Sequence, residues 1–221
     1  MIFIFDRIRY DIRAIKERDP AARNSLEVLL LYSGLHAVIN HRIANFFYRH
    51  KMFFLARMIS QSSRFFTGIE IHPGATIGRG LFIDHGMGVV IGETTVIGDN
   101  CTIYQGVTLG GTGKDKGKRH PTLGNNVMVG SGAKVLGPFT VGDNAKIAAG
   151  AVVLDAVAPN STAVGVPAKA VVKGKGKWGG AEELDQIHIP DPVSQELARL
   201  QKQIRELQKK IDTQSKEGES K

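Results

Sequence analysis

An aliphatic side chain recurs at every sixth residue through a long central stretch of the chain, from about Ile69 to Ala170. A fixed period of six is typical of a parallel β-helix, in which each hexapeptide supplies one short strand and one corner, and three hexapeptides complete a coil. A β-sandwich would instead show strict apolar and polar alternation with hairpin turns at wider spacing, and neither pattern occurs here. The recurring positions are Ile71, Ile77, Ile83, Ile91, Ile97, Ile103, Leu109, Leu123, Val129, Val135, Val141, Ile147 and Val153.

The segments around this repeat predict an α+β fold in three parts. We expect an N-terminal α-helical region over residues 1–66, a left-handed parallel β-helix over 67–172, and a linker with a C-terminal amphipathic helix over 173–221. The helices should cover residues 2–18 and roughly 51–65, with another between them that starts at Asp19-Pro20, because Asp is a favoured N-cap and Pro suits the first turn. The residues of this middle helix expected to point inward are Leu26, Leu29, Leu30, Leu35, Val38 and Ile43.

The C-terminal part combines a linker rich in glycine and lysine, residues 173–181, with a periodic apolar stripe. The steps of the stripe alternate between four and three residues, which is the spacing of a short coiled coil that could bundle three chains. The same stripe could instead lie along the solenoid as an amphipathic helix, and both arrangements stay open. Its members are Val193, Leu197, Leu200, Ile204, Leu207 and Ile211.

Positive charge is concentrated ahead of the repeat. Residues 1–66 hold eleven Lys and Arg against five Asp and Glu, which accounts for six of the eight net positive charges. The basic residues are scattered singly along amphipathic helices, so we expect a solvated face and no nucleic-acid partner. No apolar run is long enough to cross a bilayer, which argues against a membrane partner. The single cysteine, Cys101, and the charged first residues predict a cytoplasmic protein without disulfides.

The repeat loses its step twice, and each interruption contains a histidine. Between Ile83 and Ile91 the step is eight residues, and between Leu109 and Leu123 it is fourteen. A loop extruded from a regular solenoid adds nothing to the core, so loops of this kind are more often binding machinery than scaffold. The two interruptions are therefore the candidate functional segments.

His85, in the first interruption, is the candidate general base. A neutral imidazole can take a proton from a hydroxyl group, and a carboxylate on its second nitrogen fixes the tautomer. Glu70 lies fifteen residues earlier, close to one coil of eighteen, so it is the candidate for that carboxylate. The alternatives are a surface histidine at a corner and a solvated glutamate in a turn.

The second interruption is basic and rich in glycine. Its backbone amides have little steric cover, which together with nearby positive charge suits a phosphate-bearing cofactor or a carboxylate. The glycine-rich part runs from Thr108 to Gly113, and the cations are Lys114, Lys116, Lys118 and Arg119.

Four motifs together resemble the serine O-acetyltransferases, a family of hexapeptide-repeat acyltransferases. The similarity covers roughly residues 15–172, and the long second motif followed by Arg-His-Pro is highly specific. The motifs are Glu70-Ile-His-Pro-Gly-Ala, Ile83-Asp-His-Gly-Met-Gly-Val-Val-Ile-Gly-Glu-Thr, Gln105-Gly-Val-Thr-Leu-Gly-Gly-Thr-Gly and Arg119-His-Pro.

The resemblance implies transfer of an acetyl group from acetyl-CoA to the hydroxyl of L-serine, the first step of cysteine synthesis. It implies that His85 deprotonates the hydroxyl, that Asp84 and Asp19 hold the serine ammonium, and that Arg119 and His120 grip its carboxylate. It also implies active sites between the subunits of a homotrimer, with acetyl-CoA in the groove between two solenoids and no metal. The matching cofactor positions are Gly111, Thr112, Ser131, Ala149 and Lys146.

The chain departs from the family pattern at three points. Glu70 stands where the family usually has Asp. The helical region ahead of the solenoid is shorter than in the hexameric members, which favours a trimer. Family members typically bind cysteine synthase through a terminal Ile, whereas this sequence ends Gly218-Glu-Ser-Lys221.

Two other enzyme classes share this repeat. A hexapeptide acetyltransferase for a sugar or an antibiotic would use the same histidine base with different contacts to the acceptor. A γ-type carbonic anhydrase would bind zinc through three histidines between subunits, for which His72, His85 and His120 are available, although their spacing does not resemble that site.

Overall fold

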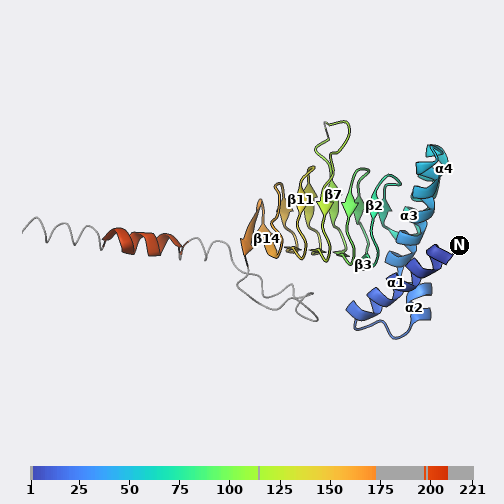
Figure 1. Ribbon diagram of the computed structural model, residues 1–221, viewed down its shortest axis with the longest axis horizontal. Coiled ribbons are helices and arrows are strands. Elements are labelled where there is room, and N and C mark those ends of the chain that lie inside the picture. The colour runs from blue at the N-terminus through green and yellow to red at the C-terminus, as the bar shows by residue number, and fades with distance from the viewer. Residues whose placement is uncertain (1, 114, 173–196, 198, 209–221) are drawn as a thin grey trace, which may run out of the picture. The chain divides into compact units, whose positions relative to one another are not determined.

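The computed structural model describes residues 2–113, 115–172, 197 and 199–208. It divides into two units, Met1–Ile189 and Pro190–Lys221. The first unit contains four helices followed by a solenoid of short parallel strands, so the predicted α+β class with a parallel β-helix is confirmed (Figure 1). No helix within the described ranges is both long and apolar enough to cross a bilayer.

The helices are α1 (Ile2–Arg18), α2 (Ser25–Leu31), α3 (Ser33–Arg49) and α4 (Phe53–Thr67). The predicted bounds of α1 are confirmed, but the helix expected at Asp19-Pro20 starts later. Its N-cap is Asn24, whose side-chain oxygen accepts a hydrogen bond from the Glu27 amide at 2.9 Å. Asp19 instead lies in the turn before it, which leaves its carboxylate available for other partners.

The predicted inward face of the middle helix is partly wrong. Leu35 and Val38 are buried, whereas Leu26, Leu29, Leu30 and Ile43 are exposed in the single chain. The reason is that the segment forms two helices, with extended backbone at Tyr32 between them. This break resets the helical phase, so one continuous periodicity cannot describe both helices, and Val28 is the buried residue of α2.

Fifteen strands follow in the described part of the chain, and the first thirteen each add one side of a triangular coil. Three sheets result, which are parallel apart from the last pair, β14 and β15. We name them sheet A (β1-β4-β7-β10-β13), sheet B (β11-β8-β5-β2) and sheet C (β15-β14-β12-β9-β6-β3). The strands are β1 (Glu70–Ile71), β2 (Thr76–Ile77), β3 (Phe82–Asp84), β4 (Val90–Ile91), β5 (Val96–Ile97), β6 (Thr102–Tyr104), β7 (Thr108–Gly110), β8 (Thr122–Leu123), β9 (Met128–Val129), β10 (Lys134–Leu136), β11 (Thr140–Val141), β12 (Lys146–Ile147), β13 (Val152–Val153), β14 (Ser161–Gly165) and β15 (Ala168–Val172).

The recurring aliphatic residues form three columns inside the solenoid. In sheet A, Ile71, Ile91, Leu109, Val135 and Val153 are in register from rung to rung. Each is buried, because the pleat sends alternate side chains inward and neighbouring coils cover one another. All thirteen positions singled out in the sequence fall in a strand, so the hexapeptide period corresponds to the strand spacing.

The corner between sheets B and C is the most regular of the three. Asn100, Asn126, Asn144 and Asn160 take left-handed φ values of 55° to 59° there, a conformation that Asn tolerates better than most residues. Their side chains form a ladder, with Asn126 donating to Asn144 at 3.1 Å and Asn144 to Asn160 at 3.0 Å. This corner is structural, and both interruptions of the repeat lie at the other two corners.

Both ends of the solenoid are covered. At the first coil, α3 and α4 pack against β1 and β3, and the Ser60 hydroxyl donates to the Ile71 carbonyl at 2.8 Å (Figure 1). At the last coil, β15 pairs antiparallel with β14.

In the second unit, residues 199–208 are helical and expose Leu200, Ile204 and Leu207. The linker 173–181, together with Val193 and Ile211, lies outside the described residues.

Candidate active site

His85 lies at the corner between sheets C and A, in the turn from β3 to β4. Its φ is 58°, and Gly86 and Gly88 are also left-handed. The turn is held to the preceding coil by a hydrogen bond from the Gly88 amide to the Gly68 carbonyl, at 3.0 Å. The imidazole is 75% exposed. A left-handed histidine is strained by about 1–3 kcal/mol, and such strain is common where a side chain must be aimed at a substrate.

Two carboxylates lie beside His85. Asp84 Oδ1 is 3.8 Å from His85 Nε2, and burial raises the pKa of the Asp84 carboxyl, with a further contribution from the negative charge of Asp19. Asp19 accepts hydrogen bonds from the Tyr32 hydroxyl at 2.6 Å and from the Ala21 amide at 2.8 Å. Asp84 thus lies beside both His85 and Asp19.

Glu70 has different neighbours from those expected. It lies on β1, and its carboxylate forms ion pairs with Arg57 at 3.2 Å and Arg64 at 3.1 Å, both on α4. Its role as the orienting acid of His85 therefore stays a prediction.

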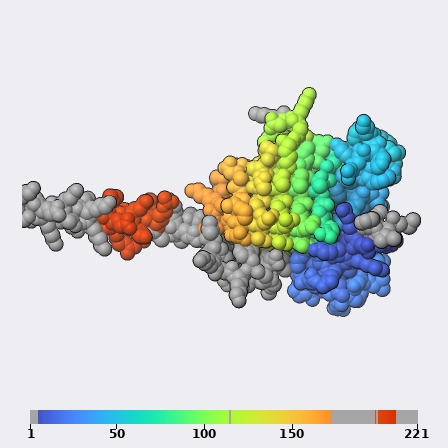
Figure 2. Space-filling view, viewed as in Figure 1, coloured from blue at the N-terminus to red at the C-terminus, as the bar shows by residue number. Residues whose placement is uncertain are grey.

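Arg119 and His120 lie at the corner between sheets A and B, in the long loop from β7 to β8, which stands out from the solenoid (Figures 1 and 2). The base of this loop is anchored to Thr94, one coil earlier. The Thr94 hydroxyl oxygen accepts hydrogen bonds from the amides of Arg119 at 3.0 Å and His120 at 3.1 Å. Lys118 Nζ donates to the Thr94 carbonyl at 2.7 Å.

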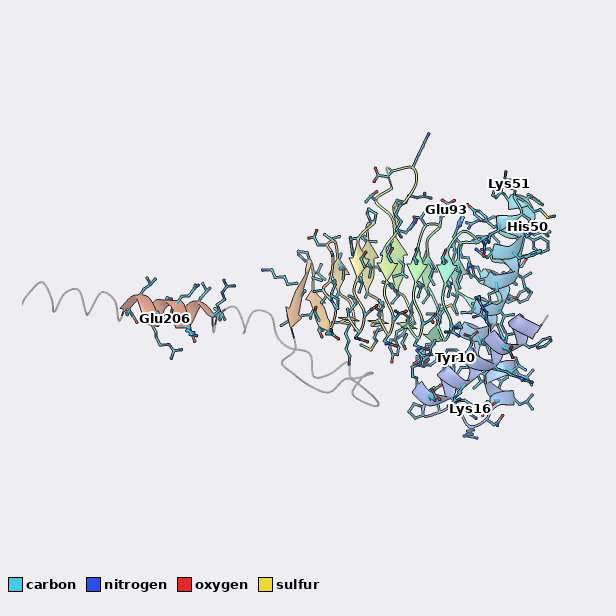
Figure 3. The ribbon with its side chains drawn as sticks, in the orientation of Figure 1. Tyr10, Lys16, His50, Lys51, Glu93 and Glu206 are labelled. Carbon is cyan, nitrogen blue, oxygen red and sulfur yellow. The ribbon has the colours of Figure 1, made fainter. Side chains whose placement is uncertain are left out.

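Glu93 holds the positively charged Arg119 side chain of the same loop in place. Its carboxylate forms a short ion pair with the Arg119 guanidinium and accepts a hydrogen bond from the Tyr48 hydroxyl at 2.8 Å. Figure 3 shows Glu93 on the side of the solenoid from which the loop rises. The hydrogen bonds from Arg119 and Tyr48 lower the pKa of Glu93, whereas burial followed by the charge of Arg119 lowers the pKa of His120. At neutral pH the loop base therefore presents a fixed guanidinium beside a neutral imidazole.

Glu93 and Thr94 were not singled out from the sequence. Both belong to the second motif, Ile83 to Thr94, but the repeat is regular at their position. What distinguishes them is their place at the A–B corner, one coil before the long loop. Recognising that place requires the register of the coils, and the period of six alone does not give it.

The expected cofactor positions divide between the two corners. Ser131 and Ala149 lie on the C–A corner above His85, and each turn there is tied to the next, for example by the Gly150 amide and the Ser131 carbonyl at 2.8 Å. Gly132 and Gly150 have open space where a side chain would begin. Gly111 and Thr112 lie in the loop at the A–B corner, and Lys146 is on β12.

Within one chain, the predicted residues thus form two groups at opposite ends of the strands of sheet A. The group where these strands begin, at the C–A corner, comprises His85, Asp84, Asp19, Ser131 and Ala149. The group where they end, at the A–B corner, comprises Arg119, His120, Gly111 and Thr112. The base and the cationic loop therefore do not meet in the single chain.

The histidines considered for zinc are divided in the same way. His72 and His120 lie near one another at the A–B corner, where the charge of His72 is one of the smaller causes that lower the pKa of His120, and His85 is at the C–A corner. Within the described part of the chain, no group of three or more His, Cys, Asp or Glu side chains is arranged to hold a metal ion.

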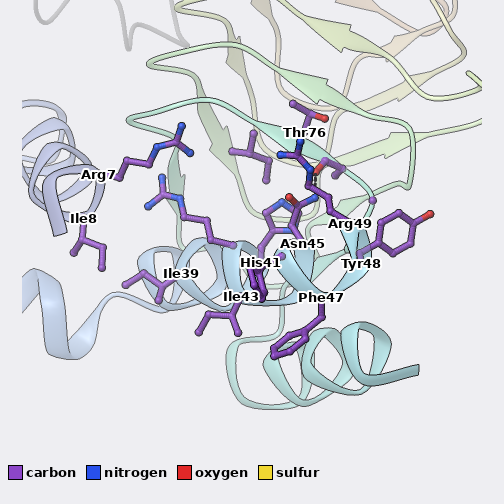
Figure 4. Close-up of a pocket in the computed structure, with 15 residues that line it drawn as sticks. Arg7, Ile8, Ile39, His41, Ile43, Asn45, Phe47, Tyr48, Arg49 and Thr76 are labelled. Carbon is purple, nitrogen blue, oxygen red and sulfur yellow. Dashed lines mark hydrogen bonds between the residues drawn. The ribbon is translucent and has the colours of Figure 1, made fainter. Parts of the chain in front are cut away.

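A separate hollow of about 1230 Å³ lies between α1, α3 and β2 (Figure 4). Its lining includes Arg7, His41 and Arg49. None of the residues predicted from the sequence to act in catalysis or binding lines it, so its size does not identify it as the active site.

Comparisons with known proteins agree with the resemblance of the motifs. Residues 3–39 match the family model "Serine acetyltransferase, N-terminal". Residues 120–155 match "Bacterial transferase hexapeptide (six repeats)", and residues 88–111 match "Hexapeptide repeat of succinyl-transferase".

Relatives cover most of the chain. The serine acetyltransferase of Bacillus subtilis is 56% identical over 208 residues, which are 94% of this chain and 95% of the relative. The crystal structure of Neisseria gonorrhoeae serine acetyltransferase in complex with serine is 44% identical, with a TM-score of 0.75 over 77% of this chain and 70% of that one. A serine acetyltransferase in complex with CoA is 42% identical, with a TM-score of 0.72 over 76% and 69% of the two chains.

The fold, the two interrupted corners and these relatives lead to one assignment. A relative that is more than half identical over nearly its whole length shares the family of the chain it matches. The chain belongs to the serine acetyltransferase family.

Proposed function

We propose that this protein transfers the acetyl group of acetyl-CoA to the hydroxyl of L-serine, giving O-acetyl-L-serine and CoA, with His85 as the general base. The observation that carries this assignment of roles is the exposed His85 imidazole beside the Asp84 and Asp19 carboxylates. An amino acid brought to this corner by its ammonium group would have its hydroxyl close to the imidazole.

The chemistry needs one proton to move twice. As the serine oxygen attacks the thioester carbonyl, His85 takes the hydroxyl proton and a tetrahedral oxyanion forms. When the oxyanion collapses, the C–S bond breaks and the sulfur leaves, receiving the proton from the imidazolium. Asp84 beside the ring favours the imidazolium in between, because a nearby negative charge stabilises the cationic form.

Serine recognition requires groups from two chains in this proposal. Asp84 and Asp19 bind the ammonium at the C–A corner, while Arg119 and His120 bind the carboxylate from the A–B corner of a neighbouring chain. A homotrimer with one site at each of its three interfaces satisfies this requirement, since the two corners lie at opposite ends of the strands of one sheet. The relative crystallised with serine supports the substrate.

Acetyl-CoA would lie in the same groove. Ser131 and Ala149 line the corner above His85, and Gly111 and Thr112 of the neighbouring loop face it in the assembled trimer. Lys146 completes the set inferred from the family resemblance. The relative in complex with CoA supports the co-substrate.

Two further parts of the proposal concern the cell. We place the reaction in the cytoplasm, where a buried, free Cys101 is stable in a reducing environment. Cysteine synthase, the partner of the family resemblance, stays an open and untested one, and residues 209–221 lie outside the described part of the chain.

Thiol release from acetyl-CoA, measured with L-serine and a panel of other hydroxylated acceptors, tests the assignment. We expect turnover with L-serine and a loss of about 10²–10⁴-fold in kcat for His85→Ala, with an unchanged melting temperature. Preference for a sugar acceptor would contradict the substrate, and wild-type turnover by a folded His85→Ala protein would contradict the base. Arg119→Ala should raise the serine KM, whereas an enzyme for another acceptor would be little affected.

A further inference from the structure

We infer that Tyr32 and Tyr48, at the two ends of α3, are positioning residues for the two charged ends of serine. Tyr32 positions the ammonium-binding Asp19, and Tyr48 positions the carboxylate-binding Arg119 through Glu93. The inference rests on the proposed function, since it assumes that Asp19 and Arg119 bind serine.

Tyr32 is the N-cap residue of α3, with a backbone that is extended and not helical. This conformation directs the side chain out of the helix, where it packs against the cluster of Ile15, Val28, Leu35 and Phe82. Its hydroxyl donates to Asp19 Oδ2 at 2.6 Å. Since the Ala21 amide donates to Asp19 Oδ1, both carboxylate oxygens are held.

A neutral phenol suits this place. Burial, followed by the hydrogen bond to Asp19, raises the pKa of Tyr32 to about 12, so the hydroxyl keeps its proton at physiological pH. Asp19 and Asp84 repel one another, and the repulsion contributes to the raised pKa of Asp84. The hydrogen bond that Tyr32 donates to Asp19 holds this carboxylate in place near Asp84, so that both can contact one ammonium.

Tyr48 has the corresponding position near the other end of α3. Its hydroxyl donates to Glu93 Oε1 at 2.8 Å, and Glu93 Oε2 holds Arg119. The Tyr48 ring is fixed by edge-on contacts with Phe53 and His72, whose centroids are 5.1 Å and 5.8 Å away. In Figure 4, Tyr48 extends from α3 near the end that lies away from Ile39.

The helix between the two tyrosines is fixed to the solenoid at both ends. A side chain at Gly34 would collide with the Ile83 carbonyl, so the start of α3 lies directly against β3, which carries Asp84. Toward the other end, the side-chain amide of Asn45 donates to the backbone carbonyls of Pro73 at 2.7 Å and Ala75 at 3.2 Å. The seventeen residues of α3 span about 25 Å. This separation means that the Tyr32 and Tyr48 of one chain serve two different serine molecules, in neighbouring active sites.

The test compares Tyr32→Phe and Tyr48→Phe in the full-length enzyme, with Tyr10→Phe as the matched control. Tyr10 also donates one hydrogen bond from its hydroxyl, to Asn100 at 3.0 Å, but at the structural B–C corner. We expect both test variants to raise the serine KM about tenfold, since each removes a hydrogen bond to a charged group. The KM for acetyl-CoA and kcat should stay within about twofold, and the control should match the wild type.

Two competitive inhibitors separate the roles of the tyrosines. Ethanolamine keeps the ammonium and hydroxyl of serine, and 3-hydroxypropionate keeps the carboxylate and hydroxyl. Tyr32→Phe should weaken inhibition by ethanolamine alone, and Tyr48→Phe inhibition by 3-hydroxypropionate alone. A general loss of structure would weaken both inhibitors in each variant, so it cannot produce this crossed pattern.

The inference would be overturned if either variant weakened both inhibitors, or if its kinetic constants equalled those of Tyr10→Phe. This result is distinguishable from failure of the proposed function. If the wild-type enzyme turns over L-serine and loses activity in His85→Ala, the proposed function stands even where the tyrosine variants behave like the control. If His85→Ala keeps wild-type turnover, the proposed function fails first.

Discussion

His41 illustrates how a single residue can control stability without taking part in catalysis. It lies on the buried side of α3, where its ring is hydrogen-bonded to the Ala75 backbone, and its Nδ1 has no hydrogen-bond partner among the described residues. Burial, followed by the charge of Arg42, lowers the pKa of His41 to about 4. The folded protein therefore keeps this imidazole neutral at a pH where the unfolded chain would protonate it.

The sign of the resulting pH dependence follows from the two pKa values. Above about pH 6.5 both states hold a neutral histidine, so the stabilisation is complete. As the pH falls from 6.5 to about 4, only the unfolded state gains the proton, and the free energy of unfolding decreases by roughly 3 kcal/mol. We expect His41→Gln to flatten this part of the pH profile, measured by urea unfolding at several pH values.

The control for this prediction is His50→Gln, on an exposed histidine directly after α3. It is the same substitution at a surface position, and we expect it to keep the wild-type slope. Equal slopes for the wild type and His41→Gln would show that other groups cause the acid sensitivity.

At the scale of elements, the sequence predicted most where the geometry is repetitive. The period of six determined every strand of the first thirteen, because a stacked coil needs an inward aliphatic residue at each side. The two interruptions of the repeat are equally evident from the sequence. The middle helix was less predictable, because which of its faces is covered depends on the break at Tyr32 and on packing against β3, and neither is encoded in periodicity.

The loop from β7 to β8 depends on one glycine in a different turn. A side chain at Gly92 would collide with the His120 ring, which lies against the Thr94 turn. Gly92→Ala should therefore displace the base of the loop while leaving the solenoid folded. A misplacement of about 1 Å in a binding group can cost about 100-fold, so we expect kcat/KM for serine to fall by up to that factor. Steady-state kinetics together with a melting temperature would measure this.

Gly110→Ala is the matched substitution one coil later on the same corner. Its added carbon would meet the end of the flexible Leu136 side chain, which can move aside. We expect a clearly smaller loss of kcat/KM than in Gly92→Ala. Equal losses in the two variants would mean that the contact with His120 does not control the position of the loop.

At the scale of the whole molecule, the division of the site between two chains is implied by the family resemblance, but the repeat alone does not show it. The sequence identified His85 and Arg119 as functional because each lies in an interruption of the repeat. Their separation at opposite ends of the strands of sheet A depends on which strand enters which sheet, and this follows from the register of the coils. Partners such as Tyr32 and Glu93 come from other elements, so no local pattern marks them.

Mixed assemblies test whether two chains share each site. At a serine concentration well below the raised KM of Arg119→Ala, the His85→Ala and Arg119→Ala chains should both be nearly inactive alone. Co-expressed in equal amounts, they should regain about a quarter of the wild-type activity, because one interface in four of a randomly mixed cyclic assembly pairs an intact His85 with an intact Arg119. Differently tagged chains allow mixed species to be purified and assayed for thiol release. Activity that stays at the level of the separate variants, in demonstrably mixed trimers, would place all the catalytic groups within one chain and contradict the shared site.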